Sequence, residues 1–117
     1  MTSNEPLVLR ETDARGVVKL TLNRPNAFNS LSEAMLAALL AEFEAIAKDE
    51  AARLVVLGAA GKAFCAGHDL KEMRADPSLD YYQTLFAQCT QVMLAIQKLP
   101  VPVIARVHGI ATAAGCQ

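Results

Sequence analysis

Residues Leu54-Val55-Val56-Leu57 decide the fold class of this chain of 117 residues. All four are apolar, with no polar residue between them. Such a run suits a strand that is covered on both faces, whereas a strand with one solvated face alternates apolar and polar residues. Helices packed on a sheet supply that cover, so this stretch favours a protein in which helices and strands alternate.

Further strands are predicted on either side of this run. After a polar leader, Val17–Leu22 is rich in β-branched residues and places Val18, Leu20 and Leu22 on one face. Proline and asparagine then end this strand. Residues 103–107 form the third predicted strand, followed by an alanine- and glycine-rich close.

Two helices are predicted between these strands. The first spans about residues 32–48, with Ser32 as the N-cap and Glu33 in the first turn, where a carboxylate meets the positive end of the helix dipole. The second spans roughly residues 80–99 and is stopped by Pro100. Its apolar face is made of Tyr82, Leu85, Phe86, Cys89, Val92, Met93 and Ile96. This order of strands and helices predicts the α/β class.

Composition and charge exclude several classes of protein. Lys and Arg number 11 against 12 Asp and Glu, a net charge of −1, which argues against a nucleic-acid-binding face. Apolar residues make up 53%, enough for a core. No run reaches the length of a membrane span and the opening residues lack a signal-peptide pattern, so we expect a cytoplasmic protein. Cys65, Cys89 and Cys116 lack metal-binding spacing, so we expect neither a metal site nor a disulfide framework.

Two turns of small residues are the candidate functional segments. Residues 64–70 follow the buried strand, and residues 109–117 follow the third strand. Backbone N–H groups at a helix start lack partners, so such turns can hold an anion or an oxyanion. One N–H from each turn would make the two-donor hole that acyl chemistry needs. Close packing is the alternative reason for small residues at both places.

The same segments carry a family resemblance. In chain order the relevant blocks are Leu22-Asn23-Arg24-Pro25, Asn29-Ser30-Leu31, Gly61-Lys62-Ala63-Phe64-Cys65-Ala66-Gly67-His68-Asp69-Leu70-Lys71-Glu72-Met73, Pro100-Val101-Pro102-Val103-Ile104-Ala105 and Gly109-Ile110-Ala111. Together they resemble the amino-terminal part of the enoyl-CoA hydratase/isomerase (crotonase) superfamily. The resemblance implies a strand-strand-helix spiral of which residues 1–117 are the front half, within a single crotonase-like domain. It also implies a homotrimer or hexamer for the full-length protein.

The substrate implied by the resemblance is an acyl-CoA thioester, with no nucleic-acid or membrane partner. No separate cofactor is expected, because coenzyme A is part of the substrate. The backbone N–H groups of Ala66 and Ala114 would form the oxyanion hole. The residues expected to bind the substrate are Arg24, Ala27, Ala66, Gly67, His68, Asp69 and Ala114. Arg24 is a plausible phosphate partner by charge, and a solvated surface arginine is the alternative.

Gln117 occupies the position where hydratases of this superfamily place a catalytic glutamate. An amide can hold a water molecule but cannot exchange a proton near neutral pH. Two functions therefore stay open: a hydratase or isomerase of fatty acid metabolism with its proton carrier elsewhere, and a non-catalytic acyl-CoA-binding or regulatory member. The pattern resembles a hydratase-domain branch of the family. His68, with an ordinary pKa of about 6.5, is either a replacement base or a turn residue packed on the CoA arm. A scaffold fragment without a ligand site is the third alternative.

Overall fold

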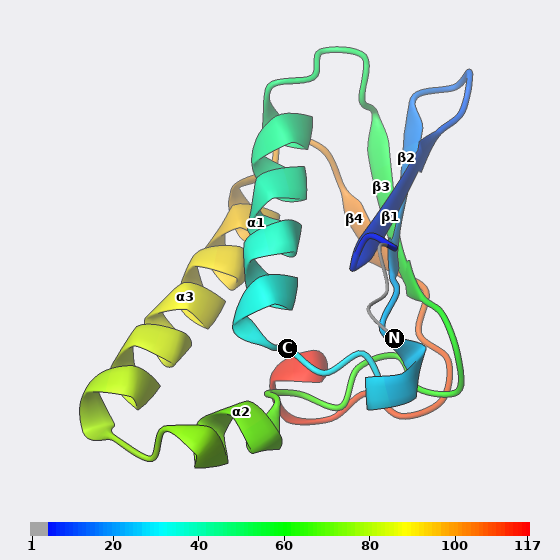
Figure 1. Ribbon diagram of the computed structural model, residues 1–117. Coiled ribbons are helices and arrows are strands. Elements are labelled where there is room, and N and C mark those ends of the chain that lie inside the picture. Colours follow the sequence, from blue (N-terminus) through cyan, green and yellow to red (C-terminus); the bar gives the residue numbers. More distant parts are fainter. Residues whose placement is uncertain (1–4) are drawn as a thin grey trace.

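The computed structural model describes residues 5–117, so the first four residues of the opening segment lie outside the described range. Within that range, one sheet carries its strands in the order β1-β2-β3-β4, with the two long helices beside it (Figure 1). The elements are β1 (Val8–Thr12), β2 (Val17–Leu22), α1 (Glu33–Ala47), β3 (Leu54–Ala59), α2 (Leu70–Ala75), α3 (Leu79–Lys98) and β4 (Val103–Ala105). Two 3-10 turns, Pro25–Ala27 and Ala113–Gly115, complete the list.

The sheet is mixed. β1 runs antiparallel to β2, with Val8 opposite Leu22, whereas β2, β3 and β4 are parallel to one another. The β1 segment lies in the predicted polar leader, and that prediction is wrong. Only the first residue of β1 is buried, so the strand shows no alternation and is held by pairing at the edge of the sheet.

The two predicted long helices are confirmed, and a serine N-cap begins each of them. Ser32 Oγ accepts a 3.1 Å hydrogen bond from the Met35 N–H at the start of α1, and Ser78 Oγ accepts one of the same length from the Tyr81 N–H at the start of α3. α3 ends at Lys98, before the predicted proline stop. Phe86, predicted on the apolar face of this helix, is 47% exposed.

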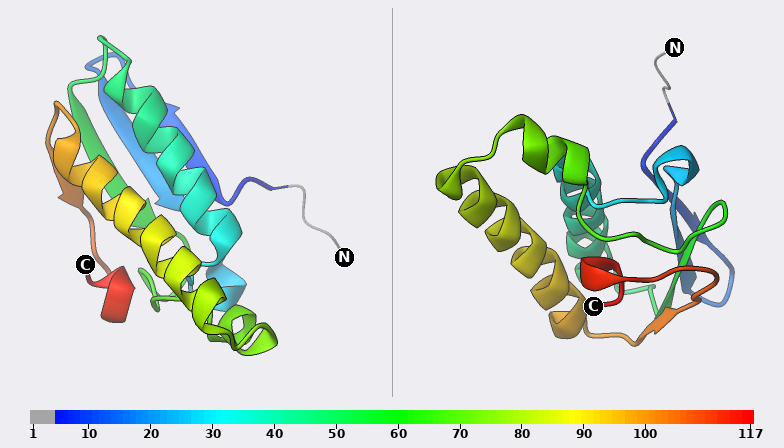
Figure 2. Two further views of the ribbon diagram at one scale, coloured as in Figure 1. Left: turned by 90° about the vertical axis from the view of Figure 1, so that its left-hand side faces the viewer. Right: turned by 90° about the horizontal axis from the view of Figure 1, so that it is seen from below.

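The hydrophobic core lies between the sheet and these two helices. α1 and α3 pack on each other and lie on the same face of the sheet (Figure 2). Val55 in β3 faces this core and is fully buried, whereas its neighbour Val56 is only half-buried. The expectation that both faces of β3 are covered is therefore wrong within residues 5–117. The third predicted strand is also shorter than expected and ends at Ala105.

No helix in residues 5–117 combines the length and the apolar character that a membrane crossing demands.

Candidate active site

Three segments that follow β2, β3 and β4 meet at one end of the sheet, the lower end in Figure 1. Parallel strands end at the same edge, so the segments that continue from them become neighbours. A bridge between Leu31 and His68 joins the first segment to the second, and a bridge between Cys65 and Ala111 joins the second to the third. The segment carrying the first predicted turn thus lies between the other two.

Backbone hydrogen bonds fix this middle segment on both sides. The Leu31 N–H donates to the Gly67 carbonyl at 2.7 Å on one side. On the other side, the Cys65 N–H donates to the Ile110 carbonyl at 3.1 Å. The first turn is therefore held by main-chain atoms, which explains why small side chains suffice there.

The two predicted turns are in direct contact at Gly67. This residue has a φ of +89°, and a Cβ placed on it would lie 3.1 Å from Ala113 Cβ and 3.6 Å from the Ala114 nitrogen. A side chain at Gly115 would overlap the Cys65 carbonyl. Only glycine fits both the backbone conformation and the close approach at position 67. The prediction that the two turns come together is borne out by this contact.

The two predicted N–H donors are not equivalent. Within residues 5–117, the Ala114 N–H donates to no other group. The Ala66 N–H, in contrast, donates to the Phe28 carbonyl at 3.1 Å. Phe28 lies in the left-handed region, with a φ of 54°. Of the two predicted donors, the Ala114 N–H is free within residues 5–117, and the Ala66 N–H is engaged by a carbonyl of the loop after β2.

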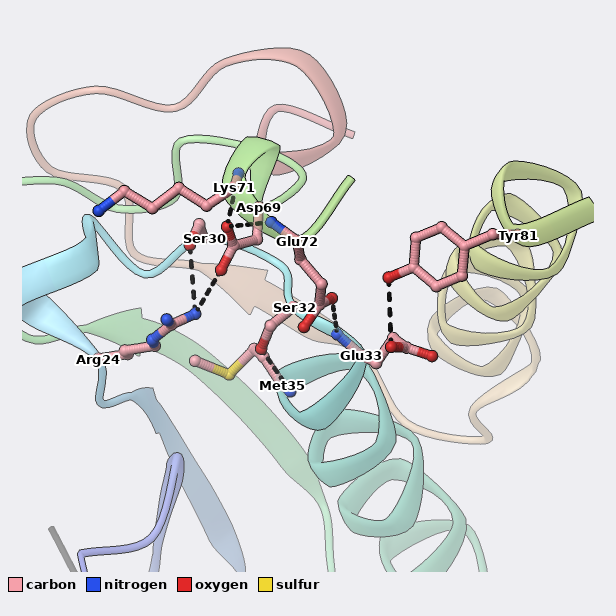
Figure 3. Close-up of polar contacts among 9 residues, drawn as sticks. All are labelled: Arg24, Ser30, Ser32, Glu33, Met35, Asp69, Lys71, Glu72 and Tyr81. Carbon is pink, nitrogen blue, oxygen red and sulfur yellow. Dashed lines mark hydrogen bonds and ion pairs between the residues drawn. The ribbon is translucent and has the colours of Figure 1, made fainter. Parts of the chain in front are cut away.

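Arg24 pairs with Asp69 (Figure 3). Arg24 Nη1 lies 2.9 Å from Asp69 Oδ2, while Asp69 Oδ1 accepts from the N–H groups of Lys71 and Glu72 at the start of α2. Burial by itself raises the pKa of Asp69, but the Arg24 guanidinium and these backbone N–H groups outweigh it and hold the pKa below its usual value. Arg24 is thus an ion-paired residue, and its role toward phosphate stays a prediction. Ala27 lies in the 3-10 turn of the same loop and is half-buried.

Glu33 and Glu72 join α1, α2 and α3 around this turn (Figure 3). Glu72 Oε1 accepts a 2.8 Å hydrogen bond from the Glu33 N–H, and the Tyr81 hydroxyl donates to Glu33 Oε2 at 3.2 Å. Desolvation and the negative charges of Glu72 and Glu33 raise the pKa of Tyr81 to about 12. These contacts fix the start of α2 directly after the first turn.

Asn29 is a residue of the site that pattern reasoning missed. It is fully buried, its Oδ1 accepts from the Arg24 N–H at 2.7 Å, and its Nδ2 donates to the carbonyls of Ala60 and Ala63 at 2.8 and 2.9 Å. Its φ of 53° suits asparagine better than most residues. The signal available in the sequence was an asparagine in a turn, a residue that both donates and accepts hydrogen bonds.

A cavity of about 600 Å³ lies between the two turns and α3. His68 and Gln117 border it from the turns, and the His68 ring lies on Phe86 with a centroid separation of 5.1 Å. Burial lowers the pKa of His68 below its ordinary value, which favours the neutral ring. A second cavity of about 390 Å³ reaches Ala114 and Gln117 and is lined mostly by apolar core residues. Gln117 therefore borders both cavities.

The family of the chain follows from comparison with known proteins. The family model for enoyl-CoA hydratase/isomerase matches residues 12–117. The chain belongs to this family. It is 38% identical to the mitochondrial enoyl-CoA hydratase domain-containing protein 3 of Rattus norvegicus, over 97% of this chain and 38% of that protein. The chain thus spans about two fifths of this relative's length.

Solved structures of the enoyl-CoA hydratase/isomerase family share the fold. The crystal structure of an enoyl-CoA hydratase from Mycobacterium smegmatis is 74% identical and superposes with a TM-score of 0.94, over 96% of this chain and 44% of that one. The human enoyl-CoA hydratase domain-containing protein 3 is 37% identical with a TM-score of 0.87, over 94% of this chain and 43% of that one. The predicted crotonase-like fold, represented by its amino-terminal part, is confirmed.

Proposed function

We propose that the full-length protein acts on acyl-CoA thioesters and stabilises the enolate oxygen of the thioester with the N–H groups of Ala114 and Ala66. The observation that supports this most directly is the contact of Gly67 with the Ala114 backbone. In this contact the middle of the first turn lies beside residues 112–114 of the second turn, next to the cavity that His68 and Gln117 border. Coenzyme A enters as part of the substrate, with Arg24 and Ala27 facing its nucleotide.

The chemistry needs main-chain donors rather than particular side chains. Removing a proton from the α-carbon, or adding water at the β-carbon, places negative charge on the thioester oxygen. Removing one donor of such a hole typically costs ~3–4 kcal/mol of barrier. The methyl group of Ala114 leaves its N–H intact. The Ala66 N–H donates to the Phe28 carbonyl, and we propose that the thioester oxygen of a bound substrate shares this donor.

A second candidate is a non-catalytic acyl-CoA-binding or regulatory protein. The side chain that favours it is Gln117, an amide that borders both cavities where a proton carrier would act. This candidate needs the same turns and the same cavity, and differs only in the fate of the bound thioester.

Two measurements on the full-length protein test the proposal. Calorimetry with butyryl-CoA measures binding, and an absorbance assay with crotonyl-CoA and longer enoyl-CoA thioesters measures turnover. We expect binding and turnover of at least one of them. Binding without turnover of any enoyl-CoA supports the non-catalytic candidate, and absence of binding overturns both.

We also propose a homotrimer or hexamer, located in the cytoplasm, for the full-length protein. Analytical ultracentrifugation of that protein tests the assembly, and a monomer at micromolar concentration would overturn it. Fluorescence microscopy of a tagged full-length protein tests the location.

A further inference from the structure

The two donor turns belong to two stretches of chain that run side by side. These paired segments are residues 61–67, after β3, and residues 108–114, after β4. The Cys65 N–H donates to the Ile110 carbonyl at 3.1 Å, and the Thr112 N–H donates to the Cys65 carbonyl at the same distance. Main-chain hydrogen bonds thus align one segment against the other.

The register of this pairing decides how the two proposed donors lie relative to each other. Ala66 belongs to one paired segment and Ala114 to the other. Gly67 contacts the Ala114 nitrogen across the pairing, since a Cβ placed on Gly67 would lie 3.6 Å from it. A shift of one segment along the other would therefore move one N–H away from the oxygen that both are proposed to hold.

His108 supplies a side-chain contact at the opposite end of the paired segments. Its Nε2 lies 2.6 Å from the Gly61 carbonyl oxygen. A carbonyl oxygen only accepts hydrogen bonds, so Nε2 carries the hydrogen and donates it. Every other hydrogen bond that joins the two segments, among the residues that the structure describes, is between main-chain atoms. Side chains specify register only weakly in glycine-rich pairings, so this one contact carries unusual weight.

The backbone approach beside His108 explains how its ring reaches across. Gly109 has a φ of +63°, and a Cβ on it would overlap the Lys62 carbonyl. Only glycine allows the two main chains to come this close. The His108 ring is therefore held next to the start of the other segment, at Gly61.

Gly61 also connects this contact to the first donor by a second route. A Cβ on Gly61 would lie 2.6 Å from Pro25 Cβ, so the two residues are packed together. Pro25 begins the 3-10 turn that ends at Phe28, and the Phe28 carbonyl accepts the Ala66 N–H. A change in the position of Gly61 would thus reach Ala66 through the loop after β2 as well as along its own segment.

We propose that His108 is a positioning residue for the oxyanion hole. Its hydrogen bond to the Gly61 carbonyl holds the register of the paired segments and thereby the relative placement of the two donor N–H groups. His108 touches no substrate in this role and acts only through the main chain. This inference rests on the proposed function.

Two substitutions in the full-length protein separate the donor from the bulk of the side chain. His108→Leu removes the donor and keeps a side chain of similar size. His108→Gln retains an N–H that can reach the same carbonyl. The ring is exposed, so neither change alters the core. The matched control is Thr84→Val, because the Thr84 hydroxyl donates to the Asp80 carbonyl at 3.0 Å within α3, outside the paired segments.

Infrared spectroscopy of bound butyryl-CoA, labelled with carbon-13 at the thioester carbonyl, reads the hole without needing turnover. N–H groups that donate to a carbonyl oxygen lower its stretching frequency. We expect a lowered band in wild type, in His108→Gln and in Thr84→Val. In His108→Leu the band should move back toward that of free butyryl-CoA. A purely structural role of His108 would lower stability without moving this band.

Kinetics with crotonyl-CoA supply a second readout. A displacement of about 1 Å can cost up to about 10²-fold in rate, and we expect kcat to fall about tenfold in His108→Leu. KM should change by less than about twofold, because the donors act mainly on the transition state. His108→Gln should restore kcat.

Nitrogen NMR of the wild-type protein adds a measurement that needs no variant to fold. A His108 ring without a hydrogen on Nε2 would overturn the inference. A wild-type band for butyryl-CoA bound to His108→Leu would overturn it too, as would a His108→Gln variant as impaired as His108→Leu. Those outcomes leave the proposed function standing. Absence of butyryl-CoA binding by wild type removes the proposed function and, with it, this inference.

Discussion

Arg24 Nη1 lies 2.9 Å from Asp69 Oδ2, and this ion pair joins the loop after β2 to the first residue before α2. The Asp69 side chain is only 13% exposed, and the Arg24 side chain 33%. Asp69 is at the same time the N-cap of α2. A single carboxylate therefore holds both the entry of a helix and the loop that contributes Phe28 to the site.

The pKa of Asp69 predicts how stability depends on pH. Burial raises this pKa and the hydrogen bonds from Arg24 and the α2 backbone lower it, with a net depression. A carboxyl whose folded pKa is depressed contributes stability above the pKa of the unfolded chain, about 3.9, and loses it as pH falls through the folded pKa. Asp69→Asn keeps a capping oxygen but loses the charge. We expect it to lower the free energy of unfolding of the full-length protein by ~1 kcal/mol at neutral pH and to flatten its acid dependence.

Urea unfolding at a series of acidic and neutral pH values measures this effect. The matched control is Asp13→Asn, because Asp13 also has a lowered pKa but pairs with Arg15 at 2.7 Å in an exposed turn. Its effect should be smaller, since solvent screens exposed pairs. An Asp69→Asn curve parallel to wild type at every pH would contradict the assignment of this ion pair.

Asn29→Asp should destabilise the protein strongly. The carboxylate can still accept from the Arg24 N–H, but it cannot donate to the carbonyls of Ala60 and Ala63, which lie 2.8 and 2.9 Å from Nδ2. It also buries a negative charge beside two carbonyl oxygens. We expect a loss of ~2–4 kcal/mol in the free energy of unfolding, measured by urea denaturation at neutral pH. Asn26→Asp makes the same chemical change at an exposed position of the same loop and should cost little.

Gly67→Ala should impair the site and the fold together. Its φ of +89° strains an L side chain, and the new methyl group would press on Ala113 Cβ at 3.1 Å and on the Thr112 carbonyl at 3.2 Å. Because these atoms belong to the second turn, the two turns must move apart. We expect kcat/KM for an enoyl-CoA substrate to fall by at least tenfold, with a loss of ~1–3 kcal/mol in stability.

Gly58→Ala is the control for that substitution. A Cβ at Gly58 in β3 meets nothing within 4 Å, so the variant should have the same free energy of unfolding and the same kcat/KM as wild type. If Gly67→Ala also behaves like wild type in both measurements, the contact between the turns does not matter for function.

Local patterns predicted the elements whose side chains face the core. The limits of β2 and α1 follow from alternation, helical spacing and the cap at Ser32, all of which act between near neighbours. The strand β1 was not predicted from the sequence, because its residues are mostly exposed and are ordered by pairing with β2. Burial of one face of β3 was predictable from its apolar run, whereas the half-buried opposite face was not.

The features of the candidate site also fall into those that local sequence patterns predict and those that they do not. Small residues in both turns predicted that main-chain groups would be accessible. Within residues 5–117 the Ala114 N–H donates to no other group, whereas the Ala66 N–H donates to the Phe28 carbonyl. Two features depend on residues far apart in sequence: the Ala66 N–H donated to Phe28, and the pairing of Arg24 with Asp69. No local pattern encodes such a partner, so only the folded chain reveals them.

Gln117→Glu should add proton transfer to a site where, within residues 5–117, the Ala114 N–H donates to no other group. Gln117 borders the cavity shared with His68, so a carboxylate there can exchange a proton with water beside a bound enoyl-CoA. General acid–base groups typically contribute 10²–10⁴-fold, and we expect roughly a tenfold or greater rise in crotonyl-CoA hydration, followed by loss of enoyl absorbance with the full-length protein. Gln97→Glu is the matched control, because Gln97 lines the same cavity from α3 rather than from the turn. Its rate should match wild type. An equal gain in both variants would show that any carboxylate in the cavity suffices, and no gain in Gln117→Glu with crotonyl-CoA still bound would show that the proton carrier lies elsewhere.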